Sequence, residues 1–148
     1  MKIAIGCDHG GVVLKPSIKE LLTKRGIEII DCGCEGERVD YPDYGQKVAE
    51  LVSTGKADKG IILCGTGIGI SIAANKVKWI RAAVCHDEYT AKMSAEHNNA
   101  NIIAMGGRVI SIELAVKMVE LWLDTPFGGG RHAERVAKIT AIEDKYFK

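Results

Sequence analysis

The amino-acid sequence predicts an α/β fold, a three-layer sandwich in which helices cover both faces of a five-stranded parallel sheet. Five short apolar runs are spaced along the chain, and each run is continuous rather than alternating. Continuous apolar runs are typical of strands that are buried on both faces of a parallel sheet. Between them lie segments whose apolar residues recur with the period of a helix, so strands and helices alternate along the chain.

The elements follow one another in a regular order. Strands are expected at residues 3–5, 27–30, 61–64, 80–85 and 102–105. Helices are expected between them, at residues 14–22, 44–52, 70–75 and 112–122. Pro126 and three glycines then break the chain, and a last helix runs from Arg131 to about Tyr146 with no strand after it. Residues 1–148 are therefore expected to form one domain of the Rossmann-like or flavodoxin-like kind.

The composition excludes several classes of function. The 148 residues include 20 Lys and Arg against 19 Asp and Glu, a formal net charge of +1, which is no electrostatic footprint for nucleic acid or an anionic membrane. No charged region precedes an apolar stretch at the N-terminus, and no apolar run approaches the ~20 residues that span a bilayer, so we expect a cytoplasmic protein. Aromatic residues make up only 5% of the chain, which leaves little material for stacking a flavin or a base.

The cysteines favour a reduced protein without a metal site. An odd number of cysteines with no signal peptide argues against a disulfide framework. No CxxC pair and no histidine spacing typical of zinc sites occurs among them. The five are Cys7, Cys32, Cys34, Cys64 and Cys85.

A glycine loop after the third strand is the strongest local signal. Cys64 closes that strand, and Gly65, Gly67 and Gly69 lead into a helix. In such folds ligands bind where strands end and helices begin, and glycines let backbone N–H groups converge on an anion. A thiol beside this loop could act as a base or nucleophile. A buried structural cysteine beside a tight turn explains the segment equally well.

Two histidines are candidates for proton transfer. Asp8 and His9 directly follow the first strand, where an imidazole oriented by a carboxylate could move protons near neutral pH. Taken alone, Asp8 fits a turn or capping residue better. His97 precedes the fifth strand, so within one chain it lies at the opposite edge of the sheet. It is therefore either structural or reaches the site of a neighbouring subunit.

Arginines form a candidate phosphate site. Arg131 and Arg135 lie four residues apart at the start of the last helix, with His132 between them, so the two guanidinium groups share one face. A solvated basic face is the commoner explanation of such a pair. Arg108 is a further phosphate candidate, and Tyr41 could present its hydroxyl to a ligand. This inventory fits proton abstraction next to the carbonyl of a small phosphorylated metabolite, and does not fit hydride transfer.

Together these segments resemble the ribose-5-phosphate isomerase type B family, which also holds the galactose-6-phosphate isomerase subunits. The resemblance covers essentially the whole chain, and its motifs are GCDHGG (6–11), VDYPDY (39–44), CGTGIGISIAANK (64–76), IRAA (80–83), HNNAN (97–101) and GGRH (129–132) with Arg135. It implies an aldose–ketose isomerase of the pentose phosphate pathway that interconverts ribose 5-phosphate and ribulose 5-phosphate without a cofactor or metal.

The resemblance also implies a role for each candidate residue. Cys64 would be the base that moves a proton between C1 and C2 through an ene-diolate. Backbone N–H groups of the following loop would hold the oxyanion, namely those of Gly65, Gly67, Ile68 and Gly69. Opening of the sugar ring would involve Thr66, Asp8, His9 and His97. Tyr41 would line the pocket and Asn98 would contact the reacting oxygens. The phosphate would be held by Arg131, Arg135, Arg108 and His132.

The family forms dimers or tetramers, so the resemblance implies a homodimer or homotetramer with sites shared between subunits. His97 and Asn98 would then come from the partner, and the last helix would pack on it. Two rival hypotheses stand beside this one. The first is an isomerase of a six-carbon sugar phosphate, such as allose 6-phosphate or galactose 6-phosphate. The second is a non-enzymatic flavodoxin-like or receiver-like module, which the scarcity of aromatic residues and of acids near Asp8 disfavours.

Overall fold

The computed structural model describes residues 1–147, and they form the predicted α/β sandwich around a five-stranded parallel sheet. The strands are β1 Lys2–Cys7, β2 Glu28–Asp31, β3 Lys59–Cys64, β4 Ala82–Val84 and β5 Ile102–Gly106. Their order across the sheet is β2-β1-β3-β5-β4, and each neighbouring pair is parallel. After β3 the chain therefore forms β4 at the edge of the sheet, and then returns to place β5 between β3 and β4.

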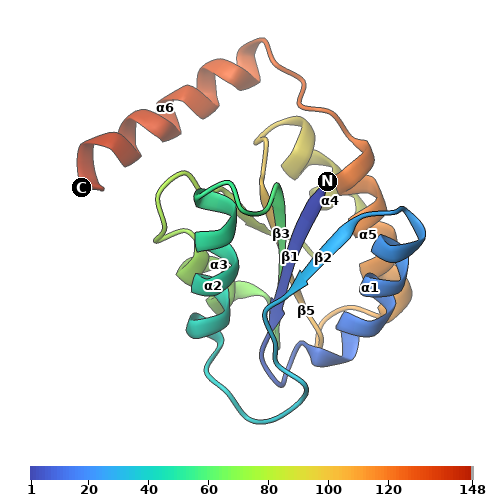
Figure 1. Cartoon of the computed structure of the whole chain (residues 1–148). Helices are drawn as coiled ribbons and strands as arrows, with labels where there is room; N and C mark the ends of the chain where they lie inside the picture. The colour runs from blue at the N-terminus through green and yellow to red at the C-terminus, as the bar shows by residue number, and fades with distance from the viewer. Residues whose placement is uncertain (148) are drawn as a thin grey trace.

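Helices cover both faces of this sheet (Figure 1). They are the short 3-10 helix η1 Val12–Leu14 and the α-helices α1 Lys15–Lys24, α2 Tyr41–Ser53, α3 Ile68–Ala74, α4 Glu88–Glu96, α5 Ile112–Asp124 and α6 Arg131–Tyr146. Helices α1, α4 and α5 pack on one face, and α2 and α3 pack on the other. Helix α6 stands apart from both layers, across the end of the sheet at which the strands begin (Figure 1).

The core explains why the apolar runs are continuous. Successive side chains of a strand point to opposite faces of the sheet. In β3, Ile61 and Leu63 pack with α1 and α5, whereas Ile62 and Cys64 pack with α2 and α3. Both faces are covered by helices, so the run from Ile61 to Cys64 is apolar at every position, while Lys59 at the start of the strand is only partly buried.

Two elements differ from expectation. Helix α4 shows no apolar stripe because the residues that it buries, Ala91, Ser94 and Ala95, are small. A capping box marks its start, since the Asp87 side chain accepts a hydrogen bond from the Thr90 N–H at 2.7 Å. Strand β4 covers only Ala82–Val84 of the expected run of residues 80–85, and it pairs with β5 alone.

Helix α6 begins and ends where the sequence predicts, but none of its 16 residues is buried. Ile139, Ile142 and Tyr146 are exposed at 47%, 61% and 66%. Most of a helix's stability comes from packing an apolar face, so this helix lacks a partner for that face among residues 1–147. No helix in the described part of the chain combines the length and hydropathy that crossing a bilayer requires.

Candidate active site

Three loops meet at the end of the sheet where β1, β3 and β5 finish, and glycine makes their contact possible. A Cβ on Gly11 would overlap the Leu63 backbone, and one on Gly107 would overlap the Gly10 carbonyl oxygen. A Cβ on Gly106 would lie 2.6 Å from the Thr66 Cα, closer than real Cβ contacts. The floor of the site is therefore backbone packed on backbone.

Cys64 lies in this floor as the last residue of β3. Its side chain faces α2 and α3, and the residue is 4% exposed. The chain then turns through Gly67, whose φ of 82° suits glycine, and the Gly67 N–H donates to the Cys64 Sγ at 3.1 Å. The N–H places partial positive charge at the atom that would carry the charge of a thiolate.

The loop after Cys64 keeps part of its donor set free. The Gly67 N–H is committed to the Cys64 sulfur, and the Ile68 N–H donates to the Thr66 Oγ1 at 3.2 Å. Within residues 1–147, the N–H groups of Gly65, Thr66 and Gly69 make no hydrogen bond. Of the four expected oxyanion donors, Gly65 and Gly69 therefore keep a free N–H within the described residues, and the N–H of Thr66 is free beside them.

Asp8 and His9 follow β1 into the same loop cluster. The Asp8 Oδ1 accepts hydrogen bonds from the N–H groups of Gly10 at 2.8 Å and Gly11 at 3.2 Å, and the residue is 7% exposed. Asp8 therefore performs the turn role that its sequence position favours. His9 is exposed, and its Nδ1 accepts the Val39 N–H at 3.4 Å, so its Nε2 is the nitrogen left to face a ligand.

Tyr41 and Arg108 complete the group at this edge. The Tyr41 ring lies against the Cα of Gly69, since a Cβ there would be 2.6 Å from the ring carbon Cζ. The Arg108 guanidinium lies over Gly65, because a Cβ added to Gly65 would be 3.2 Å from the Arg108 Nη1. The carboxyl edge of the sheet thus holds Asp8, His9, Tyr41, the loop from Cys64 to Gly69, and Arg108.

The other predicted residues gather at the opposite edge. The rings of His97 and His132 stack with centroids 4.2 Å apart and an interplanar angle of 15°. The Gly128 N–H donates to the Glu96 carbonyl oxygen at 2.9 Å, which fixes the start of α6 against the end of α4. Desolvation, followed by the positive charges of His97 and two arginines, lowers the pKa of His132. Asn98, Arg131 and Arg135 are exposed beside this pair.

One chain does not bring the two groups together. From Gly60, which is paired with the first residue of β5, to Cys64 there are four residue steps, or about 13 Å at ~3.3 Å per step. His97 precedes β5 and lies beyond the start of that span. Cys64 and His97 are therefore separated by far more than the ~3 Å reach of proton transfer. Likewise Arg108 lies at one edge and Arg131, His132 and Arg135 at the other.

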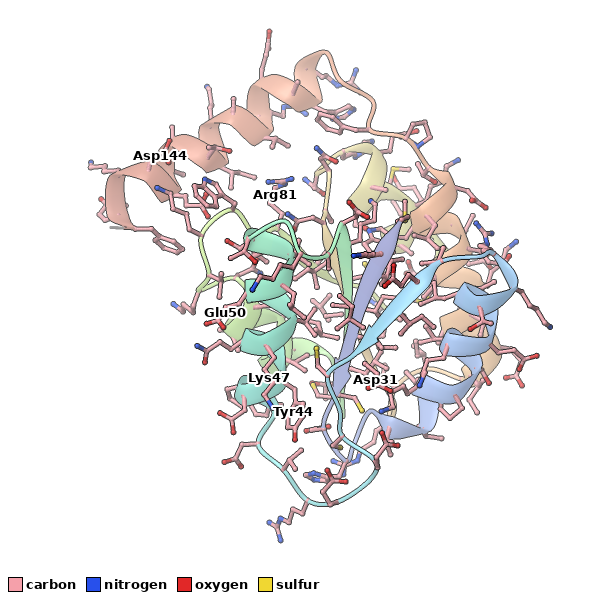
Figure 2. The ribbon with its side chains drawn as sticks, in the orientation of Figure 1. Asp31, Tyr44, Lys47, Glu50, Arg81 and Asp144 are labelled. Atoms are coloured by element: carbon pink, nitrogen blue, oxygen red, sulfur yellow. The ribbon has the colours of Figure 1, made fainter. Side chains whose placement is uncertain are left out.

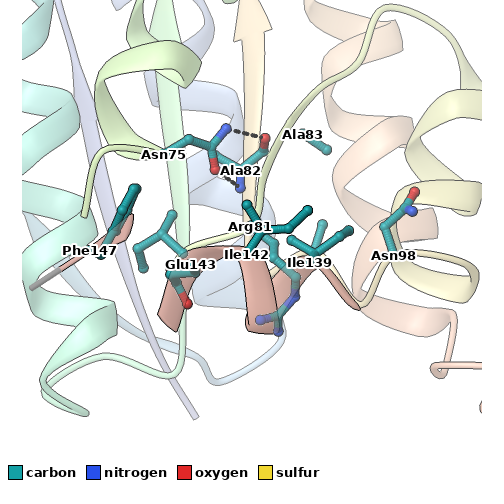
Figure 3. A pocket seen from close by; sticks show the side chains of 11 residues that line it. Asn75, Arg81, Ala82, Ala83, Asn98, Ile139, Ile142, Glu143 and Phe147 are labelled. Atoms are coloured by element: carbon teal, nitrogen blue, oxygen red, sulfur yellow. Dashed lines mark hydrogen bonds between the residues drawn. The ribbon is translucent and has the colours of Figure 1, made fainter. Parts of the chain in front are cut away.

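A cavity of about 430 Å³ lies between α6 and the sheet (Figure 3). Its walls are mostly apolar, with Ile80, Ile139 and Ile142 among them, and Asn98 lies at its margin. Arg81 projects into the space beneath α6, which carries Asp144 on its far part (Figure 2). The C-terminal part of α6 is anchored, because Glu143 accepts the Trp79 N–H at 2.6 Å. The helix thus bridges an apolar hollow beside His97 and Asn98.

The described residues offer little for a metal. No group of three or more His, Cys, Asp or Glu side chains within residues 1–147 has an arrangement that could hold a metal ion. The five cysteines are free thiols, of which Cys7, Cys34, Cys64 and Cys85 are buried.

Comparison with known proteins identifies the family. The sequence profile described as Ribose/Galactose Isomerase matches residues 3–139. The chain belongs to this family. Ribose-5-phosphate isomerase B of Escherichia coli is 52% identical over 145 residues, 97% of either chain. The structure of Clostridium thermocellum ribose-5-phosphate isomerase B matches with a TM-score of 0.96 and 60% identity, over 99% of both chains. The resemblance to the type B isomerases is thereby confirmed.

The family also includes relatives with other named substrates. The galactose-6-phosphate isomerase subunit LacB of Clostridium acetobutylicum is 43% identical over 139 residues, 93% of this chain and 80% of that protein. Family membership therefore establishes the isomerase class, within which relatives are named for sugar phosphates of different length.

Sequence reasoning missed several residues of this site. Gly106 and Gly107 directly follow the fifth apolar run, at the edge where the ligand was expected, so their position was a usable signal. The contact of the Val39 N–H with His9 had no signal, because it joins two segments that are 30 residues apart in the sequence.

Proposed function

We propose that this chain is a ribose-5-phosphate isomerase that interconverts ribose 5-phosphate and ribulose 5-phosphate, with Cys64 as the base. The observation that carries the proposal is the Gly67 N–H at 3.1 Å from the Cys64 Sγ, at the floor of three glycine loops. A thiolate held there is close to three unpaired backbone N–H groups. This pairing of a base with oxyanion donors suits proton transfer beside a carbonyl.

The reaction moves protons without net oxidation. The Cys64 thiolate takes the proton from C2 of the open-chain aldose, and the C2–H electron pair forms the double bond of an ene-diolate while negative charge develops on O1. The thiol then returns a proton to C1, and the proton of the C2 hydroxyl passes to O1, which leaves the C2 ketone. The N–H groups of Gly65, Thr66 and Gly69 are the donors for the developing charge, and removing one such donor costs about 3–4 kcal/mol in other enzymes.

The cyclic sugar must open before this step. Opening requires a proton donor at the ring oxygen and an acceptor at the anomeric hydroxyl. His9 and Asp8 with Thr66 supply candidates on the Cys64 side, and His97 supplies one on the other side. We assign the lining of the pocket to Tyr41, and contact with the reacting oxygens to Asn98.

Arginines supply the proposed binding site for the phosphate group of the substrate. Arg131 and Arg135 project from the exposed first turns of α6 with His132, and Arg108 lies beside Gly65. Guanidinium groups match phosphate oxygens in charge and geometry. A complete clamp needs both sets of arginines, which lie at opposite edges of one chain.

We therefore propose that the functional unit is a homodimer, or a tetramer built from such dimers, with each site shared between two subunits. The carboxyl edge of one subunit would face His97, Asn98 and the start of α6 of the other. Unpartnered apolar surface supports this arrangement. Ile68 and Ile72 on α3 are exposed at 55% and 57%, and the hollow under α6 has apolar walls.

An isomerase of a six-carbon sugar phosphate is the second candidate, because a relative at 43% identity is named as a galactose-6-phosphate isomerase subunit. We favour the five-carbon substrate because the relatives at 52% and 60% identity are named for it. With that substrate the enzyme would serve the pentose phosphate pathway. Five free thiols suit the reducing cytoplasm.

A coupled assay tests the proposal. Wild type, Cys64→Ser and Cys85→Ser are compared on ribose 5-phosphate, allose 6-phosphate and galactose 6-phosphate, with a metal chelator present throughout. Cys85 is also a buried free thiol, but it packs in the core on the opposite face of the sheet from Cys64, and it serves as the matched control. We expect turnover of ribose 5-phosphate that survives in Cys85→Ser and collapses in a folded Cys64→Ser. Full activity of Cys64→Ser would refute the thiol base, and preferred turnover of a hexose phosphate would select the second candidate.

A further inference from the structure

Lys15 is a buried lysine that the proposed chemistry does not use. It is the first residue of α1 and only 3% exposed. Its ammonium group donates to three oxygen atoms: the Cys34 carbonyl oxygen at 2.7 Å, the Asp31 Oδ1 at 3.2 Å and the Glu35 Oε1 at 3.3 Å. A buried ammonium is costly unless it is paired in this way.

The charge of this lysine is retained in the fold. Burial by itself would lower the pKa of Lys15, but the hydrogen bonds that its ammonium group donates to Asp31 and Glu35 outweigh burial, so the pKa is raised. The ammonium group therefore joins α1 to the turn formed by residues 31–35. Figure 2 shows Asp31 at the end of β2 next to α1.

The turn is also fixed to the end of β1. The Gly33 N–H donates to the Asp31 Oδ1 at 2.9 Å, and the Gly33 carbonyl oxygen accepts the Cys7 N–H at 2.8 Å. The Cys34 N–H in turn donates to the Cys7 carbonyl oxygen at 3.0 Å. Cys7 directly precedes Asp8, so the turn is attached to the start of the site loop.

From this turn the chain runs on to His9. Residues 35–38 are exposed, and the next residue, Val39, donates its N–H to the His9 Nδ1 at 3.4 Å. Exposed residues give the segment little packing of its own. Its path is set by its two ends, which are the Lys15 anchor and the start of α2.

We propose that Lys15 is a positioning residue of the active site, which acts through the turn 31–35 to hold the Val39 N–H against His9. The His9 ring is thereby oriented with Nε2 toward the ligand. The inference rests on the proposed function, and Lys15 is not one of the residues that contact the substrate in that function. A purely structural role for Lys15 would instead affect the whole fold.

The test compares Lys15→Met with Lys19→Met. Methionine keeps the length and the apolar stem of lysine but removes the charge. Lys19 is the matched control, because its Nζ also pairs with Asp31, at 2.9 Å, but its side chain is 39% exposed and, among residues 1–147, donates no hydrogen bond to the backbone of the turn. Amide hydrogen exchange of Val39 and of the β5 residues is measured in the intact protein, together with kcat and KM for ribose 5-phosphate.

In Lys15→Met we expect Val39 to exchange at least about tenfold faster while β5 exchange is unchanged, because only local opening is affected. The value of kcat should fall about tenfold, as for one lost orienting hydrogen bond, with less change in KM. Lys19→Met should leave each quantity near wild type. Equal acceleration at Val39 and in β5 would show a global effect and overturn the proposal, as would an unchanged Val39 or an unchanged kcat.

Asp31→Asn is the second variant if Lys15→Met does not fold. Asparagine keeps an oxygen for the Gly33 N–H but weakens the Lys15 anchor, so the same changes should appear at smaller size. An unchanged Val39 in this variant counts against the proposal. If wild type turns over no sugar phosphate, the proposed function fails, and the exchange data still decide whether Lys15 holds Val39.

Discussion

Two inactive variants, each altered at a different edge of the sheet, should restore activity when their subunits are mixed. Cys64→Ser removes the proposed base at the carboxyl edge, and His97→Asn removes the imidazole at the amino edge. The span of about 13 Å between the start of the β3–β5 pairing and Cys64 excludes a site made from both residues of one chain. A shared site therefore contains one residue from each subunit.

The expected recovery follows from this arrangement. In a randomly assembled equal mixture, about half of the dimers are hybrids, and one of the two sites in each hybrid has both residues intact. The mixture should therefore reach about one quarter of wild-type kcat, while each variant alone stays near background. A tetramer built from such dimers gives the same fraction.

The assay uses ribose 5-phosphate and the two proteins refolded together from denaturant, so that subunits exchange. Each variant refolded alone is the control, and sedimentation confirms that all samples have the same oligomeric state. A refolded mixture that stays at the background of the single variants would refute the shared site. Substantial activity in a stable monomer would refute it as well.

Three further outcomes are expected from single substitutions. In Gly69→Ala the new Cβ would lie 2.6 Å from the Tyr41 Cζ, so the half-exposed ring must move. The proposed hydrogen bond between the Tyr41 hydroxyl and the substrate would then be lost, and KM should rise about tenfold. Asp31→Asn should destabilise the fold at pH 7. Burial would raise the pKa of Asp31, but hydrogen bonds from two lysines and a backbone N–H outweigh burial and lower the pKa below 3.8. The ionised carboxylate therefore stabilises the fold above about pH 4, and this stabilisation is lost as the pH falls through the lowered pKa. Burial raises the pKa of Cys7 from 9.0 to about 12, so wild type should lose stability as pH rises from 9 toward 12, and Cys7→Ala should lose less.

Each of these outcomes has a direct check. Tyr41→Phe is the control for Gly69→Ala, because it removes the hydroxyl without displacing the ring; a KM unchanged in both variants would contradict the contact. For the two ionisable groups, urea unfolding is measured across pH. A constant difference between wild type and Asp31→Asn from pH 7 to pH 2 would contradict the linkage, and so would parallel alkaline losses in wild type and Cys7→Ala.

The sequence predicted the elements best where one residue pattern has one structural explanation. The unbroken apolar run through Ile61 and Leu63 indicated a strand buried on both faces, and the break at Pro126 located the start of α6. It failed at α4, because Ala91 and Ser94 pack closely without forming an apolar stripe. Small residues bury little surface each, so periodicity does not reveal them.

By itself, the sequence determined the fold class, the glycine loop beside Cys64 and the edge at which a ligand should lie. These depend on local pattern and on the geometry that all parallel α/β sheets share. Tertiary structure alone decided that β5 inserts beside β3, which brings Gly107 against Gly10, and that Val39 reaches His9. Such contacts depend on strand order and loop path. The glycines show that close backbone approach is possible, but not which loop approaches, and the backbone N–H of Val39 is a donor that almost any residue carries.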